Sequence, residues 1–179
     1  MKKLFFFALL LFSIQNTIAQ CFTKISGGRR ANHALKTDGT FWGWGQGDGG
    51  QHGDGNNTDY SVPTPLPFAG AIQSFVSTGF CTFILTTTGQ LWGAGFNTTG
   101  QLGINSTALS GTSFVQVGTA SNWRQVSSSS SFTGAVKTDN TLWVWGENNT
   151  NQMGNATCCA NRLVPGQLGT ANDLSLIHI

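Results

Sequence analysis

The stretch that decides the fold is Ala34-Leu35-Lys36-Thr37-Asp38-Gly39-Thr40-Phe41-Trp42-Gly43-Trp44-Gly45. The same pattern returns in residues 84–95 and 135–146, so Trp42, Trp92 and Trp143 lie 50 and 51 residues apart. Periods of this length are typical of solenoids, propellers and repeat arrays. The chain is therefore expected to repeat one structural unit three times.

Each repeat contains two β-rich runs separated by a short turn, at Asp38-Gly39, Thr88-Gly89 and Asp139-Asn140. We expect a β-hairpin at each place, with Asp-Gly forming a two-residue type I′ turn. Alternation along the run after the turn puts Trp42 and Trp44 on one face, and Trp143 and Trp145 likewise. In the second repeat Ala94 takes the place of the second Trp, so this part of the blade must be filled by other side chains or be thinner.

A small sheet cannot bury its apolar face alone, and radial packing of successive sheets supplies the missing neighbour. Period, strand content and hairpins together predict an all-β fold, a β-propeller with blades of about 50 residues. A β-solenoid is the alternative, but its rungs are usually shorter. The expected blades are residues 20–70, 71–120 and 121–171.

The first residues have the layout of a secretory signal peptide. Lys2 and Lys3 precede an apolar run over residues 4–14, and cleavage is expected after Ala19. The apolar run is shorter than the ~20 residues that a membrane span needs. We therefore expect residues 1–19 to be removed, the mature protein to be secreted or held at the cell surface, and no membrane span to remain.

Charge excludes one class of partner. The chain has nine Lys and Arg against seven Asp and Glu, and loss of Lys2 and Lys3 leaves seven against seven. A neutral mature protein lacks the basic excess with which nucleic-acid-binding proteins replace phosphate counterions. No nucleic-acid partner is expected.

The four cysteines are Cys21, Cys81, Cys158 and Cys159. Export would permit disulfides, and four cysteines allow three full pairings among which sequence cannot choose. A bridge between the adjacent Cys158 and Cys159 would be strained, so a bond from one of them to another cysteine is the preferred interpretation.

No residue pattern predicts catalysis, a cofactor or a metal. The acidic side chains lie in turns and Gly/Asn-rich loops, with no pair held at the spacing that glycoside hydrolysis requires. Asp54 to Asp59 is rich in oxygen ligands but lacks the later Glu of a calcium loop, which favours a solvated turn. His33, His52 and His178 are far apart in sequence and are expected to be structural or solvated.

Residues 34–45 and 134–146 resemble the repeat of the regulator of chromosome condensation family, and residues 93–103 resemble its Trp-Gly…Gly-Gln-Leu-Gly segment. The resemblance covers nearly all of residues 21–169 and implies a propeller, commonly of seven blades. Three repeats would form an incomplete part of it. The repeat pattern stops at Leu174–Ile179, so we expect residues 172–179 to be an aberrant or truncated end and the chain to be a fragment. Nucleotide exchange, the activity of the founding member, conflicts with export and neutral charge.

Two functional hypotheses follow from the sequence. The first is an exported, non-enzymatic scaffold that binds a protein or a glycan through its variable loops. A secreted inhibitor of β-lactamases, similar in architecture, is a specific version of this hypothesis. The second is a fragment of a secreted hydrolase or lyase whose catalytic part is missing.

Overall fold

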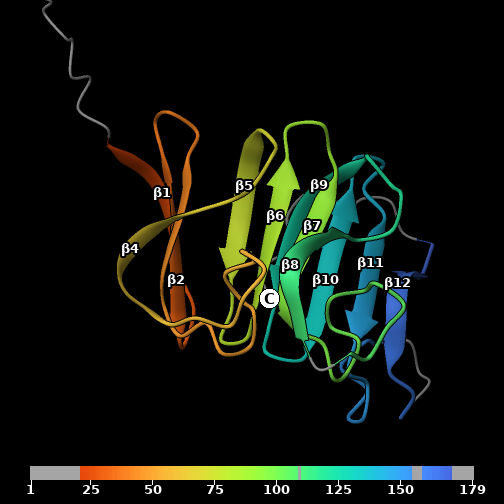
Figure 1. Cartoon of the computed structure of the whole chain (residues 1–179). Coiled ribbons are helices and arrows are strands. Elements are labelled where there is room, and N and C mark those ends of the chain that lie inside the picture. Colours follow the sequence, from red (N-terminus) through yellow and green to blue (C-terminus); the bar gives the residue numbers. More distant parts are fainter. Residues whose placement is uncertain (1–20, 109, 155–158, 171–179) are drawn as a thin grey trace, which may run out of the picture.

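The computed structural model describes residues 21–108, 110–154 and 159–170, and these residues form three four-stranded antiparallel sheets (Figure 1). Blade 1 contains β1 (Phe22–Gly27), β2 (Ala31–Lys36), β3 (Phe41–Gly45) and β4 (Tyr60–Leu66). Blade 2 contains β5 (Ile72–Ser77), β6 (Cys81–Thr86), β7 (Leu91–Phe96) and β8 (Ser110–Gln116). Blade 3 contains β9 (Trp123–Ser128), β10 (Phe132–Lys137), β11 (Leu142–Gly146) and β12 (Arg162–Leu168).

The blades stand side by side like those of a propeller (Figure 1). Each sheet keeps its strands in chain order, and the first strands touch, β1 against β5 and β5 against β9. The fourth strands are the outer edges, where Pro63, Pro65 and Pro165 limit pairing with other chains. The all-β fold with three blades is as predicted, and it is an incomplete propeller. The described residues contain no helix that could span a membrane.

The hairpin turns are present but of another type than expected. Gly39 N–H donates to Lys36 O at 3.0 Å, and Lys36 N–H donates to Thr40 O at 3.0 Å. Gly39 has φ 83°, while Asp38 has no positive φ. This is a three-residue loop in which a left-handed residue follows the turn. The prediction of a two-residue type I′ turn is therefore wrong, because only one residue per turn is left-handed: Gly39, Gly89 (φ 76°) or Asn140 (φ 66°).

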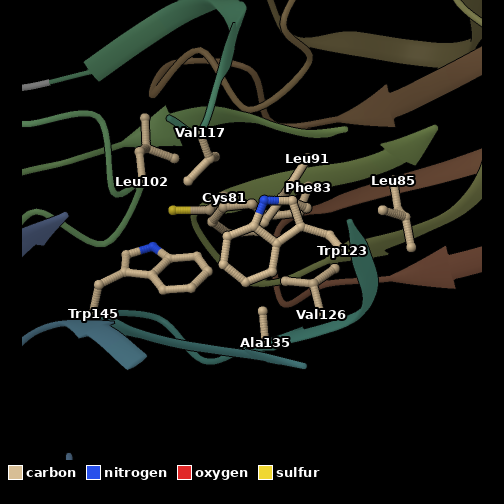
Figure 2. Packing of buried hydrophobic residues seen from close by; sticks show 10 residues of the cluster. All are labelled: Cys81, Phe83, Leu85, Leu91, Leu102, Val117, Trp123, Val126, Ala135 and Trp145. Carbon is tan, nitrogen blue, oxygen red and sulfur yellow. The ribbon is translucent and has the colours of Figure 1, made fainter. Parts of the chain in front are cut away.

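Two apolar seams hold the blades together. The first seam, between blades 1 and 2, contains Leu35, Phe41, Leu66, Phe75 and Ile84. The second seam, between blades 2 and 3, contains Cys81, Phe83, Leu85, Leu91, Leu102, Val117, Trp123, Val126, Ala135 and Trp145 (Figure 2). Strand β6 is buried at every position, because one of its faces meets each seam.

The tryptophan pattern follows the predicted alternation. Trp143 and Trp145 both contact the Trp123 ring, at centroid distances of 6.0 and 5.9 Å, so they share a face. Ala94 is fully buried, and the first seam takes Phe114 from the neighbouring strand β8 instead of a second Trp. The Phe114 ring contacts Phe41 and Phe68.

The cysteines differ from the preferred pairing. Cys21 and Cys81 both carry free thiols, and Cys159 is disulfide-bonded. Cys81 is enclosed in the second seam, where its Sγ donates to Phe96 O at 3.1 Å and burial raises the pKa of its thiol to about 12. A bridge from the Cys158–Cys159 pair to Cys21 or Cys81 is thus wrong. Cys158, like residues 1–19 and 172–179, lies outside the described residues.

Candidate protein-binding face

One end of the blades carries three equivalent loops: β1–β2 (residues 28–30), β5–β6 (residues 78–80) and β9–β10 (residues 129–131). Each closes with the same hydrogen bond of 2.8 Å, in which the first loop residue donates to the carbonyl that follows the loop. Each also accepts a main-chain hydrogen bond from the end of the third strand, at Gln46 just after β3, Phe96 at the last position of β7, or Glu147 just after β11. The end is therefore a rigid platform rather than a set of independent loops.

Glycine sets how closely these loops meet. A Cβ on Gly28 would lie 1.8 Å from the Thr78 carbonyl oxygen of the next blade, far inside any allowed contact. Gly79 in turn lies against Arg29 on one side and Ser130 on the other, with contact distances of 3.2 and 3.7 Å from its ideal Cβ. The three loops consequently form one continuous surface across blades 1 to 3.

An aromatic groove of about 320 Å³ opens on this surface between blades 2 and 3. Phe80 and Phe96 meet edge to face at 5.2 Å and form one wall, while Ser130 and Ser131 line the other. Gln101 fixes the floor, since its Nε2 donates to Ser130 O at 3.3 Å and its Oε1 accepts from Thr99 N–H at 3.0 Å.

Two arginines lie beside the groove. The Arg30 guanidinium stacks over Phe80 at 5.0 Å from the ring centroid, and Arg29 is exposed next to it. Neither arginine forms an ion pair within the described part of the chain. Arg and aromatic side chains on a rigid, partly apolar surface are the composition of protein-binding hot spots.

The acidic residues that the sequence singled out hold loops together. Asp38 Oδ1 accepts from Thr40 N–H and Oγ, and these hydrogen bonds lower the pKa of Asp38; Asp139 is held in the same way by Thr141. Asp54 accepts from the Tyr60 hydroxyl, and Asp59 accepts from Gly47 N–H at 2.8 Å. Within residues 21–108, 110–154 and 159–170, no three His, Cys, Asp or Glu side chains are grouped as metal ligands.

The sequence reasoning missed one cluster. His33 and His52, which appeared isolated, meet in the first seam, where His33 Nε2 lies 3.2 Å from His52 Nδ1. The available signal was the alignment of the repeats, in which His33 and His52 take the positions of the apolar Phe83 and Leu102 of blade 2. His178 lies outside the described residues.

Residues 38–85 match the regulator of chromosome condensation (RCC1) repeat. The chain therefore contains an RCC1-type repeat. The matched repeat begins in the β2–β3 turn of blade 1 and ends in β6 of blade 2, so an RCC1 sequence repeat contains the contact between two blades rather than one whole blade.

Parts of several known proteins are similar to this chain. The chain is 40% identical over 86 residues to the ultraviolet-B receptor UVR8 of Arabidopsis thaliana, covering 46% of the chain and 19% of that protein. Prp20p of Saccharomyces cerevisiae superposes with a TM-score of 0.76 at 19% identity, over 85% of the chain and 39% of Prp20p. Human WBSCR16 gives 0.73 at 21% identity, over 83% and 39%. The chain thus spans less than half the length of these proteins.

Proposed function

We propose that this chain is part of an exported, non-enzymatic RCC1-type scaffold that binds a protein partner through the platform of Arg29, Arg30, Phe80 and Phe96. The observation that carries the proposal is the groove at this end, where an aromatic wall and unpaired guanidinium groups sit on loops fixed by main-chain hydrogen bonds. A preorganised surface of this kind binds with little loss of conformational entropy.

The RCC1-type neighbours support a protein as the ligand class. Prp20p has been described together with its binding to Gsp1p and histones, and also in a complex with Kap60. Within the described residues the carboxylates accept loop hydrogen bonds, which is the arrangement of a scaffold rather than of a carboxylate catalyst. A glycan is the alternative ligand for a scaffold of this kind.

Photocrosslinking tests the proposed face. The chain from residue 20 is produced with a photoreactive phenylalanine at position 96 or, as a control, at position 22, since Phe22 is an exposed aromatic of blade 1 away from the groove. Incubation with the secreted and surface proteins of the source cell should give specific adducts from position 96, and Arg30→Ala should reduce them at least about tenfold. Identical adducts from both positions would reject the face, and capture on a glycan array without protein adducts would make the ligand a glycan.

A further inference from the structure

A hydrogen-bonded chain of side chains crosses the first seam from blade 2 into blade 1. Ser77 Oγ lies 2.7 Å from His33 Nδ1, His33 Nε2 lies 3.2 Å from His52 Nδ1, and His52 Nε2 lies 3.3 Å from Gly45 O. His33 and His52 are 0% and 1% exposed. This series of hydrogen bonds therefore lies within the seam itself and not on the molecular surface.

The acceptor at the end of this series of hydrogen bonds determines which ring nitrogens carry a proton. Gly45 O can only accept, so His52 Nε2 carries a hydrogen and donates it. His52 Nδ1 is then the acceptor for His33 Nε2–H, and His33 Nδ1 accepts from the Ser77 hydroxyl. Every ring nitrogen is satisfied only when both imidazoles are neutral.

The second seam has no such chain. Strand register places Phe83 at the position of His33, since they face Gly93 and Gly43 respectively, and Leu102 follows Gln101 as His52 follows Gln51. Both apolar side chains are fully buried. One RCC1-type position pair is thus titratable in the first seam and inert in the second.

Few charges face the histidine pair. Towards His33, β5 and β6 present Ser77 and Thr82, β3 presents Gly43, and the Phe41 ring stacks at 5.3 Å. The negative charges of Asp54 and Asp59 raise the pKa of His52 but not that of His33, and Asp54 also accepts a hydrogen bond from Tyr60. The pKa of His33 is lowered to about 3, chiefly by burial and further by the charge of the neighbouring His52. Burial also lowers the pKa of His52.

We propose that the Ser77–His33–His52 chain is an acid-sensitive latch, which holds blade 1 on blade 2 when both imidazoles are neutral and releases it when they take up protons. A proton on the pair buries a positive charge, and the carboxylates Asp54 and Asp59 offset the cost of burial only in part and only at His52. A second proton sets two cationic rings against each other at 3.2 Å. Release exposes Phe41 and Phe75, which meet in the same seam.

Hydrogen exchange by blade tests the latch, because a released single blade has no second sheet to cover its apolar face. Exchange of the chain from residue 20 is followed from pH 7.5 to 4.5 and corrected for intrinsic rates. Amides of β2 and β3 should lose about a hundredfold in protection. This is the factor expected at pH 4.5, about two units below the ordinary pKa that His33 regains once blade 1 is released. Amides of β10 and β11 should lose less than about tenfold. Equal loss in blades 1 and 3 would overturn the latch.

The matched variant gives the first seam the residues of the second, His33→Phe with His52→Leu. It should hold blade 1 protection constant to within about threefold over the same range, while an unchanged acid response would overturn the proposal. The wild-type protein supplies an independent measurement through ¹⁵N-labelled histidine spectra. His33 should keep the neutral Nε2–H form down to the pH at which blade 1 protection is lost. A charged His33 ring in the protected state above pH 6 would also overturn the latch.

Discussion

The two seams of this molecule are built from the same repeat positions and differ in chemistry. In the second seam, Phe83, Leu102 and Trp145 pack as apolar side chains, and Gln101 Nε2 bonds to Ser130 O of the next blade. In the first seam, His33 and His52 replace Phe83 and Leu102, and the buried Gln51 Nε2 has no hydrogen-bond partner. An apolar contact is indifferent to pH, while a buried polar one is stable only in one protonation state. The stability of the second seam therefore does not depend on histidine protonation, while the first seam is stable only when its histidines are neutral.

Removing the centre of the apolar seam should have the largest effect. Phe83→Ala deletes a ring that is fully enclosed between blades 2 and 3 (Figure 2) and leaves a cavity. The expected loss is about 3–5 kcal/mol of unfolding free energy, measured by urea denaturation at pH 7.5. Val115→Ala, on the exposed face of β8, is the control and should change stability by less than about 0.5 kcal/mol. A loss below about 1 kcal/mol for Phe83→Ala would mean that this seam is not a stabilising joint.

Acid should have the next largest effect, through the histidines of the first seam. The folded-state pKa of His33, about 3, lies below its unfolded value, so the stability is full above pH 6.5 and falls as the pH drops towards 3. At pH 4.5 the loss from His33 is about 2–3 kcal/mol. Urea denaturation at half-unit pH steps measures it, with His33→Phe/His52→Leu as the reference. Parallel curves for the two proteins would assign the acid response to other groups.

The sequence was sufficient for the architecture because period, hairpins and blade packing depend on repeated local signals. It was insufficient for the seams. Sequence alignment places His33 with Phe83 and His52 with Leu102, but the contact between residues 33 and 52 depends on how the loop after β3 folds back onto the sheet. Likewise, Asp38-Gly39 fits two hairpin loops that differ by one residue, and only the hydrogen bond from Lys36 N–H to Thr40 O distinguishes them. The groove combines loops from different blades, which no single repeat encodes.

Introducing the histidine pair into the second seam should make the stability of that seam depend on pH too. Ser128 and Thr133 occupy the register positions of Ser77 and Thr82, so Phe83→His with Leu102→His would find a hydroxyl at the equivalent place. We expect a loss of about 1–2 kcal/mol at pH 7.5, because packing is replaced by neutral hydrogen bonds, and a new decrease in stability below pH 6.5. Urea denaturation at pH 7.5 and 5 measures both. If the double variant shows no added pH dependence, a hydroxyl and two imidazoles are not sufficient for the latch.

The smallest effect concerns an unpaired group beside the first seam. Trp42 Nε1 and Trp143 Nε1 each donate to a threonine hydroxyl two residues earlier, Thr40 or Thr141, at 2.8 Å. Blade 2 has Gln90 at this position, and the buried Trp92 Nε1 has no partner. Gln90→Thr should supply the missing acceptor and stabilise the protein by about 0.5–1.5 kcal/mol.

Gln90→Val is the matched control, since it has the shape of Thr without the hydroxyl and should lack this gain. Thermal unfolding at pH 7.5 separates the two variants by a few degrees, because about 1 kcal/mol moves the midpoint of a domain of this size by roughly 2–4 °C. A gain shared by both variants would come from β-propensity at the start of β7, and the unpaired indole would then cost the fold nothing. A gain confined to Gln90→Thr would show that blade 2 lacks a bond that blades 1 and 3 both make. The first seam would then be weakened for a reason independent of its histidines, and its response to acid would act on a contact that the unpaired indole already weakens.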